Sequence, residues 1–246
     1  MPAPSPTIVR SLGLPPRLAP YTDRILAHVD SLGGYTPLVM SLAKAIRPVP
    51  RTIIDLACGK GHLSVRLAAI GTVLAVDAHR PFVVAARNLA SSRGVSRTCR
   101  FRVDLIRSFC PPLPVDLACM IGLLPAAAGA KVLRRLVHPG GHYIIDDCIR
   151  VSTSRRFRHV PTLVKVRKAL SDLGDTLVQE VVVPEQTVFG QSRRIRAAVA
   201  RAVRELVKTH PECEHDAAEF LAALEESSRL LSGPLRPTIW LVRRGD

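Results

Sequence analysis

The sequence predicts an α/β protein built on a mostly parallel, seven-stranded β-sheet with helices on both faces. Short apolar runs alternate with stretches of helical periodicity along most of the 246 residues, which is the pattern of β-α-β units. The apolar runs are nearly continuous, as expected for strands that are covered on both faces. The chain is 47% apolar and 22% charged, so it can bury a core and is not disordered.

The N-terminal region is predicted to form a loose arm and two helices that cap the sheet domain. Residues 1–20 are rich in proline, which favours an extended arm. Helical periodicity follows over 21–32 and 37–46, and two closely spaced prolines then end the helical region. We therefore expect the arm and capping helices to occupy 1–50 and the sheet domain to occupy 51–246.

Seven apolar, β-rich runs are predicted to form the strands. They span residues 52–56, 72–77, 101–105, 115–121, 142–147, 176–183 and 236–243. Helical periodicity follows most of them, which favours crossover connections between parallel strands. The sequence Pro139-Gly-Gly141 predicts a turn directly before the fifth run.

A helical insertion is predicted between the sixth and seventh runs, over about 190–232. Apolar residues recur at helical spacing in two stretches, and His210-Pro211 separates them. If the sixth strand is parallel to the first five, it ends at the edge of the sheet where ligands bind. We therefore expect the insertion, together with the N-terminal helices, to roof the pocket of a second substrate.

The first predicted strand ends in a glycine-containing turn that opens directly into a helix. The sequence Asp55-Leu-Ala-Cys-Gly-Lys-Gly61 places small residues at Ala57, Gly59 and Gly61, which lets a ligand approach the backbone closely. The first N–H groups of the following helix add hydrogen-bond donors. The second strand ends in Asp77, where a carboxylate can accept hydrogen bonds from two ribose hydroxyls. These features predict a site for a nucleoside cofactor.

Two details favour S-adenosylmethionine over a dinucleotide. The dinucleotide fingerprint G-x-G-x-x-G has a third glycine where this chain has Ser64. Asp55, which precedes the turn, would repel a pyrophosphate but would attract a cationic amino group. S-adenosylmethionine carries an ammonium, a sulfonium and a ribose, and it has no phosphate.

Four motifs in this order resemble those of class I S-adenosylmethionine-dependent methyltransferases. They are Asp55–Gly61, Val73–Asp77, Val115–Cys119 and His138–Asp147. The resemblance covers residues 50–147 well and extends through the last two strands. It implies a Rossmann-like sheet of seven strands whose last strand is antiparallel.

The resemblance also implies roles for individual residues. Asp55 and the 57–61 turn would hold the methionine part of the cofactor, Asp77 its ribose, and Asp104 its adenine amine. Ala57 stands where the family usually has glycine, and we expect this to reduce the room without preventing binding. The predicted cofactor-binding residues are Asp55, Ala57, Cys58, Gly59, Gly61, Asp77, Ala78, Asp104, Leu105 and Met120.

Two adjacent carboxylates, Asp146 and Asp147, end the fifth predicted strand. Because successive side chains point to opposite faces of a sheet, we expect one to cap the next segment and the other to face the methyl acceptor. The pattern alone does not choose between them, and Asp147 is our candidate for a catalytic general base. The pair resembles the acidic couple of divalent-cation-dependent catechol-type O-methyltransferases. A third acidic ligand is missing after the fourth strand, so no metal is predicted.

The chain is strongly basic, with 35 Lys+Arg against 20 Asp+Glu and a net charge of +15. Of these cations 29 are arginines, a bias that a GC-rich genome produces by itself. Aromatic residues make up only 4% of the chain, which is few for stacking on unpaired bases. The motifs typical of base-methylating enzymes are also missing. A nucleic-acid partner is therefore possible but not favoured.

The predicted function is methyl transfer from S-adenosylmethionine to an oxygen or nitrogen atom of an unidentified small molecule. Two alternatives stay open: an rRNA or tRNA methyltransferase that uses the basic surface, and a non-catalytic nucleotide-binding module. The N-terminal sequence lacks the apolar stretch of a secretory signal, and no apolar stretch is long enough to span a membrane. The six cysteines have no paired spacing. We therefore expect a cytoplasmic protein with no membrane partner, and leave its oligomeric state open.

Overall fold

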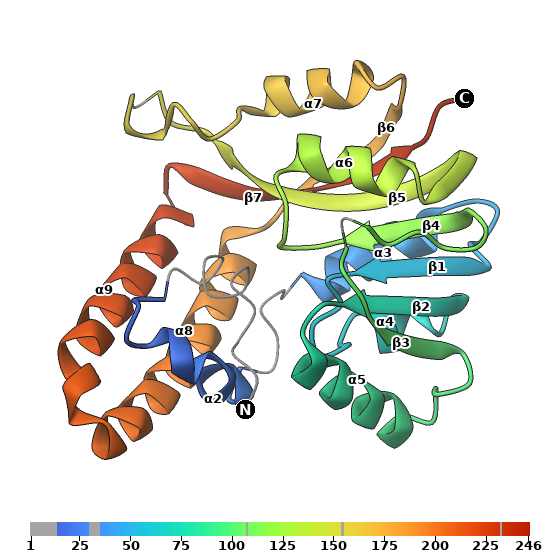
Figure 1. Cartoon of the computed structure of the whole chain (residues 1–246). Coiled ribbons are helices and arrows are strands. Elements are labelled where there is room, and N and C mark those ends of the chain that lie inside the picture. The colour runs from blue at the N-terminus through green and yellow to red at the C-terminus, as the bar shows by residue number, and fades with distance from the viewer. Residues whose placement is uncertain (1–13, 30–34, 107, 154, 232) are drawn as a thin grey trace. The chain divides into compact units, whose positions relative to one another are not determined.

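The computed structural model describes most of the chain, namely residues 14–29, 35–106, 108–153, 155–231 and 233–246. The chain divides into two compact units (Figure 1). The helical unit comprises 1–34 and 184–233, and the sheet unit comprises 35–183 and 234–246. Much of the predicted N-terminal arm, residues 1–13, lies outside the described residues. The predicted domain boundary at residue 50 stays a prediction.

The sheet unit contains one seven-stranded sheet with the strand order β3-β2-β1-β4-β5-β7-β6. The strands are β1 (Thr52–Leu56), β2 (Thr72–Asp77), β3 (Cys99–Val103), β4 (Val115–Met120), β5 (Val137–Arg150), β6 (Thr176–Val182) and β7 (Leu235–Arg243). Strands β1 to β5 pair parallel, whereas β7 pairs antiparallel with both β5 and β6. The predicted fold class, with its antiparallel last strand, is confirmed.

Helices cover both faces of this sheet (Figure 1). They are α3 (Thr36–Ala45), α4 (Ser64–Leu67), α5 (Arg80–Ser92), α6 (Ala126–Arg134) and α7 (Leu163–Ser171), and a 3-10 turn η2 (Arg155–Phe157) precedes α7. Helices α6 and α7 contact each other, as do α3 and α4. Neighbouring strand residues alternate between the two layers: Ile54 belongs to the apolar core beneath α6, whereas Asp55 contacts Ser64 of α4.

Helix α6 lies very close to the sheet. The core beneath it contains Met120 of β4 and Ile145 of β5, both almost fully buried. A Cβ added at Gly129 of α6 would overlap side-chain atoms of both residues. Glycine at this position therefore allows the helix to pack directly on the carboxyl half of β4 and β5.

The Pro139–Gly141 segment is not the turn that its sequence predicts. Strand β5 runs through this segment, and its pairing with β4 skips residues 138–141, which form a bulge. Gly140 has a φ of +77°, and a Cβ at Gly141 would lie 2.9 Å from the carbonyl oxygen of His138. Glycines are thus required by the crowded, left-handed backbone of a bulge inside the strand.

The helical unit consists of an N-terminal piece and a long hairpin. The N-terminal piece is η1 (Ala19–Tyr21) and α2 (Thr22–Ala27), and the hairpin is α8 (Glu185–Thr209), η3 (Pro211–Cys213) and α9 (Glu214–Leu231). Helices α8 and α9 lie side by side, and α2 contacts α8 (Figure 1). Tyr21 Oη lies 3.0 Å from His210 Nδ1, which links the two pieces. The predicted helical insertion between the sixth and seventh strands is confirmed, with α8 beginning somewhat earlier than expected.

Within the described ranges, no helix is both long enough and apolar enough to cross a membrane.

Asp175, in the turn before β6, joins three parts of the sheet unit. Its side chain is fully buried, with 0% exposed. It accepts hydrogen bonds from Arg134 Nε at 3.0 Å, Tyr143 Oη at 2.7 Å and the backbone N of Gly245 at 3.0 Å. A buried carboxylate needs such donors, because an unpaired one would be strongly destabilising. Asp175 therefore fixes α6, β5 and the C-terminal segment to one another.

We predict that Asp175→Ala lowers the free energy of unfolding by about 3–5 kcal/mol, because the buried partners lose their acceptor. Asp172→Ala is the matched control, since the ion pair of Asp172 with Lys168 is exposed and worth at most about 1 kcal/mol. Urea unfolding followed by circular dichroism measures both variants. Equal losses in the two variants would contradict the role given to Asp175.

Candidate active site

The predicted cofactor residues gather at the carboxyl ends of neighbouring parallel strands. Leu56, which ends β1, pairs with Val76 of β2 on one side and with Met120 of β4 on the other. The chain continues from β1 to β2 and β3 on one side, and then crosses to β4 and β5 on the other. Open α/β sheets bind ligands at such a switch point, at the carboxyl ends of the strands.

The turn after β1 has a left-handed backbone at three positions: Ala57 (φ +57°), Gly59 (φ +52°) and Gly61 (φ +79°). A Cβ added at Gly59 would meet no atom within 4 Å, whereas one at Gly61 would lie 2.9 Å from Ala86 Cβ and Phe101 Cε1. Gly59 thus leaves open space where a ligand can approach the backbone, and Gly61 allows close packing against α5 and β3. A left-handed alanine costs roughly 1–2 kcal/mol, so Ala57 is a strained position where glycine would be relaxed.

Asp77, at the end of β2, connects this turn to the next helix. Its Oδ2 accepts a hydrogen bond from the backbone N of Gly59 at 2.9 Å, and its Oδ1 accepts one from the backbone N of His79 at 2.8 Å. Burial raises the pKa of the Asp77 carboxyl, and the two N–H donors oppose that rise. A carboxylate has about four acceptor positions, so Asp77 can still accept hydrogen bonds from ligand hydroxyls.

Asp55 is the most deeply buried acid of the site, with 2% of its surface exposed. Its Oδ2 accepts a hydrogen bond from Ser64 Oγ at 2.5 Å. Burial raises the pKa of Asp55 to about 7; the Ser64 hydrogen bond opposes this rise, and the negative charge of Asp77 adds to it. Near neutral pH the carboxyl is therefore divided between its neutral and ionised forms, and a cation placed beside it would favour the ionised form.

Three cysteines surround Asp55, namely Cys58, Cys99 and Cys119. Burial raises the pKa of each thiol, and the negative charge of Asp55 adds to the rise; the pKa of Cys99 reaches about 12. These thiols are therefore neutral at physiological pH and act as small apolar groups. All six cysteines lie in the described part of the chain and are free thiols.

Asp104 reaches the site through its backbone. Its N–H donates a hydrogen bond to the carbonyl oxygen of Asp77 at 3.1 Å. Its carboxylate already has two partners, since Oδ2 pairs with Arg102 at 2.7 Å and Oδ1 accepts a hydrogen bond from the backbone N of Leu105 at 2.8 Å. Leu105 itself is 66% exposed. Because a carboxylate has about four acceptor positions, Asp104 could still accept a hydrogen bond from an adenine amine beside these two partners.

Met120 and Ala78 complete the predicted set. Met120 is 1% exposed, and a Cβ at Gly129 would lie 2.5 Å from Met120 Cε. Its side chain is thus directed beneath α6, so Met120 can offer a ligand its backbone rather than its thioether. Ala78 directly follows Asp77 and is exposed.

The two carboxylates of β5 are both bound to backbone N–H groups. Asp146 Oδ1 accepts a hydrogen bond from Gly122 at 2.7 Å. Asp147 Oδ2 accepts one from Ala126, the first residue of α6, at 2.8 Å, and its Oδ1 accepts one from Cys148 at 2.7 Å. Burial raises the pKa of Asp146 to about 6 and also raises the pKa of Asp147. Asp147, the catalytic candidate, is therefore the residue that caps a helix, and its catalytic role stays a prediction.

Sequence reasoning missed two side chains of this region, Ser64 and Tyr35. Tyr35 directly precedes α3, which contacts β5 and β7, and it lies near Asp146 and Cys148 of β5. Burial raises the pKa of Tyr35, and the charges of Asp146 and Cys148 add to the rise. The sequence around Ser64 could have predicted its role, because Ser64 stands at the third glycine position of the dinucleotide fingerprint, at the start of the helix after the turn. No local pattern could have predicted the place of Tyr35, because its neighbours are distant in the sequence.

Among the described residues, no three His, Cys, Asp or Glu side chains are grouped so that they could hold a metal ion.

Comparison with known proteins identifies the family. A family model described as a methyltransferase domain matches residues 51–200, which is more than half of the chain. The chain belongs to this methyltransferase family, and the prediction of a class I S-adenosylmethionine-dependent methyltransferase is confirmed. A search of curated protein sequences found no significant match.

Solved structures show the same fold. The Escherichia coli protein YjhP is 18% identical, with 89% of this chain and 97% of YjhP covered and a TM-score of 0.73. A SAM-dependent methyltransferase from Geobacter sulfurreducens, in complex with S-adenosylhomocysteine, is 19% identical, with 93% and 98% covered and a TM-score of 0.72. The cyclopropane synthase MmaA2 from Mycobacterium tuberculosis is 13% identical, with 99% of both chains covered and a TM-score of 0.68.

The raised pKa of Asp55 predicts how stability depends on pH. An unfolded Asp titrates near pH 4, at about 3.9, whereas the folded carboxyl titrates at about 7. Between these values the folded protein holds a proton that the unfolded chain has released. This contribution to stability is therefore complete at low pH and is lost as the pH rises through about 7.

Asp55→Asn should remove this loss, because the amide cannot ionise and its oxygen can still accept the Ser64 hydrogen bond. The free energy of unfolding of the wild type, relative to Asp55→Asn, should fall between about pH 4 and about pH 8, by at most about 4 kcal/mol. Urea unfolding of both proteins without ligand across this range measures the difference. A difference that does not change with pH would contradict the raised pKa.

Proposed function

We propose that the protein transfers a methyl group from S-adenosylmethionine to an oxygen or nitrogen atom of a small molecule. The observation that carries the proposal is the pair of buried carboxylates, Asp55 and Asp77, beside the open space at Gly59, in a chain of the methyltransferase family. The S-adenosylhomocysteine bound to the G. sulfurreducens protein of the same fold supports the choice of cofactor. The six free thiols are consistent with a reducing compartment, and we place the reaction in the cytoplasm.

Each part of the cofactor has a matching group in the proposed site. Asp55 would supply negative charge for the ammonium of the methionine part, whose presence would favour the ionised carboxylate. Asp77 would accept hydrogen bonds from the two ribose hydroxyls while it keeps its bonds to the backbone. The exposed backbone and side chains after β2 and β3, from Ala78 and from Asp104 to Leu105, would border the adenine. Met120 would contribute its backbone from β4.

The reaction requires little of the protein beyond the alignment of the acceptor with the methyl group. The acceptor's lone pair forms a bond to the methyl carbon while the carbon–sulfur bond breaks, and S-adenosylhomocysteine leaves with the electron pair. Because the sulfonium is a good leaving group, holding the acceptor in line and excluding water are the main tasks. A general base is needed when the acceptor must lose a proton during attack.

Asp77→Ala should weaken binding of S-adenosylhomocysteine by about 1–3 kcal/mol, because the ribose loses its hydrogen-bond acceptor. Asp116→Ala is the control, since Asp116 binds the backbone of Arg51 and Thr52 at the opposite edge of the sheet and should leave the affinity unchanged. Isothermal titration calorimetry of the folded variants measures both. Wild-type affinity in Asp77→Ala would refute the assignment.

We propose Asp147 as the base when the acceptor must be deprotonated. Asp147→Asn should lower the rate of methyl transfer by about 10²–10⁴-fold, while the amide oxygen still caps α6 at Ala126. The assay follows labelled methyl groups from S-adenosylmethionine into a protein-free metabolite extract. Asp147→Ala serves as the control for the cap, since it should also destabilise the protein by about 1 kcal/mol. A wild-type rate in Asp147→Asn would show that Asp147 acts only as a cap.

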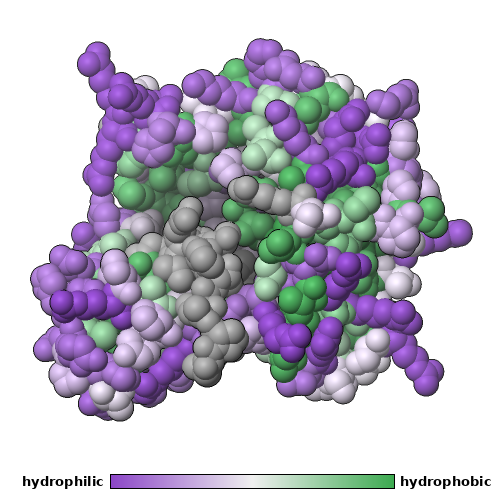
Figure 2. Space-filling view, viewed as in Figure 1, coloured by the Kyte–Doolittle hydropathy of each residue, from purple (hydrophilic) through white to green (hydrophobic). Residues whose placement is uncertain are grey.

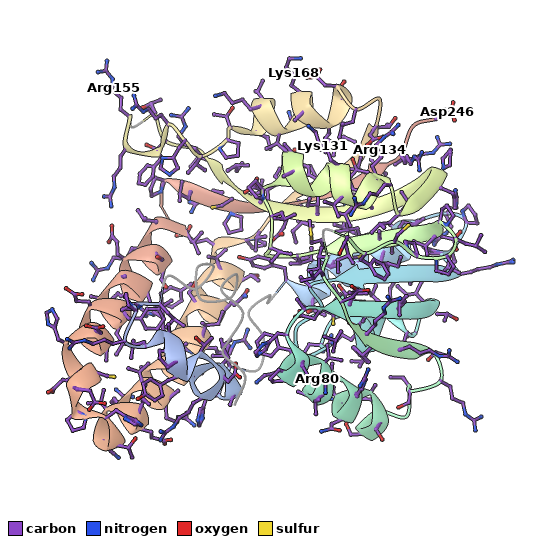
Figure 3. All side chains as sticks on the ribbon, in the orientation of Figure 1. Arg80, Lys131, Arg134, Arg155, Lys168 and Asp246 are labelled. Atoms are coloured by element: carbon purple, nitrogen blue, oxygen red, sulfur yellow. The ribbon has the colours of Figure 1, made fainter. Side chains whose placement is uncertain are left out.

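The distribution of charge favours RNA as a second candidate acceptor. The sheet unit contains 25 of the 35 Lys+Arg but only 10 of the 20 Asp+Glu, so it carries the whole net charge. Seven cations and no acid lie between Asp147 and Asp172. Arg155 and Lys168 of this segment point outward in Figure 3, and Figure 2 shows hydrophilic residues mixed with hydrophobic ones in this part of the molecule. Such a surface could follow a phosphate backbone, and the assay above separates the two acceptors when RNA replaces the metabolite extract.

A further inference from the structure

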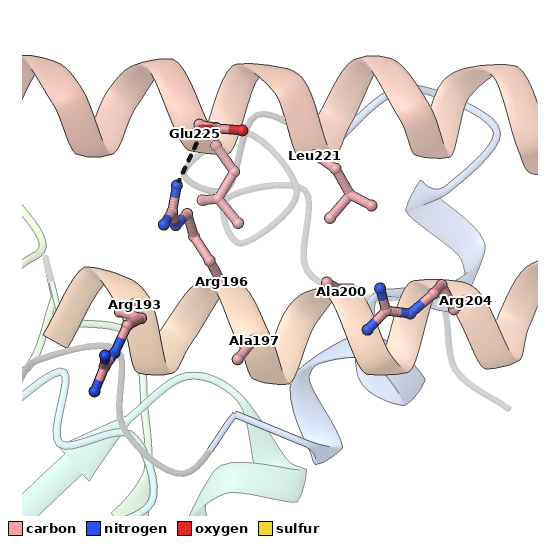
Figure 4. A pocket seen from close by; sticks show the side chains of 8 residues that line it. Arg193, Arg196, Ala197, Ala200, Arg204, Leu221 and Glu225 are labelled. Carbon is pink, nitrogen blue, oxygen red and sulfur yellow. Dashed lines mark ion pairs between the residues drawn. The ribbon is translucent and has the colours of Figure 1, made fainter. Parts of the chain in front are cut away.

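A pocket of about 400 Å³ lies between α8 and α9, entirely within the helical unit (Figure 4). Three arginines and two alanines of α8 line it on one side. Two leucines and a glutamate of α9 line it on the other. None of these residues is among the predicted cofactor-binding residues, which all belong to the sheet unit.

The pocket exists because the facing side chains of α8 are small at its centre. Ala197 and Ala200 lie on the face of α8 that lines the pocket, with Arg193 and Arg204 toward its two ends. The spacing of these positions places them on one side of the helix. Leu221 reaches into the space from α9 (Figure 4) and is half-buried. Ala197, Ala200 and Leu221 therefore form an apolar part of the lining, beside the Arg196–Glu225 ion pair (Figure 4).

The lining of the pocket carries more positive than negative charge, with three arginines and one glutamate. Arg196 Nη1 lies 3.6 Å from Glu225 Oε1, but that carboxylate also pairs with Arg229 at 3.1 Å. Arg196 Nε is buried and has no hydrogen-bond partner within the described residues. Arg193 and Arg204 make no hydrogen bond or ion pair with any described residue. The lining thus holds three guanidinium groups and one carboxylate, and that carboxylate pairs with Arg196 and with Arg229, which is outside the lining.

We propose that this pocket binds a small molecule with an apolar body and an anionic group, either a carboxylate or a phosphate. Guanidinium groups bind both anions through paired hydrogen bonds, and the alanine and leucine side chains would contact the apolar body. The volume lies in the range of small-molecule pockets, and the pocket is open to solvent, since half of its lining residues are exposed. The N-terminal residues 1–13 are not the anionic complement, because they contain no acidic residue.

The ligand chemistry is tested by calorimetry on the full chain with three probes. Decanoate combines an apolar body with a carboxylate, 1-decanol has the body alone, and acetate has the carboxylate alone. We expect saturable, one-to-one binding of decanoate and no comparable binding of the other two. Failure of decanoate to bind, or equal binding of decanol or acetate, would overturn the proposal.

The position of the site is tested by variants of α8. Arg204→Gln should weaken decanoate binding at least about 10-fold, because the carboxylate loses a charge-assisted hydrogen bond. Arg194→Gln removes the same charge from an exposed position outside the pocket and should change the affinity less than about 2-fold. Ala200→Leu fills the pocket and should abolish binding in a protein that remains folded by circular dichroism. Equal effects of Arg194→Gln and Arg204→Gln, or unchanged binding in Ala200→Leu, would place the ligand elsewhere.

Discussion

Asp77 joins the chain segments at the carboxyl ends of β1, β2 and β3, where the predicted cofactor residues lie. It accepts hydrogen bonds from Gly59, in the turn after β1, and from His79, directly before α5. The carbonyl of the same residue accepts a hydrogen bond from Asp104, after β3. Because a buried carboxylate must be satisfied by donors, one residue at the end of β2 fixes the three neighbouring segments. The left-handed turn, with its strained Ala57, is held in place by these bonds.

The carboxyl ends of β1 and β2 carry buried acids, although the sheet unit around them is strongly basic. The sheet unit has 25 Lys+Arg and 10 Asp+Glu, yet two of its few acids, Asp55 and Asp77, are buried near each other. Their burial and mutual repulsion raise the pKa of Asp55 to about 7, so ionisation of both carboxyls is unfavourable unless a positive charge lies nearby. A ligand that brings positive charge would relieve this repulsion, which is why the proposed cofactor is cationic and has no phosphate.

The sequence alone predicted local structure correctly where the signal lies within a few consecutive residues, as in strand β1 and the glycine-containing turn that follows it. It failed at 139–141, because a Pro-Gly-Gly sequence is typical of turns and of bulges, and pairing with β4 decides between them. The place of Tyr35 near Asp146 depends on how α3 crosses the sheet, which no local pattern contains. Strand alternation separated Asp146 from Asp147 but could not show that Asp147 meets the first residue of α6.

The central claim is that the buried acids after β1 and β2 form a site for a cationic, ribose-bearing cofactor. Calorimetric titration of the wild-type protein with S-adenosylhomocysteine, and separately with NAD under the same conditions, tests it most directly. We expect one-to-one, micromolar binding of S-adenosylhomocysteine and no measurable binding of NAD. Micromolar binding of NAD without binding of S-adenosylhomocysteine would contradict the account.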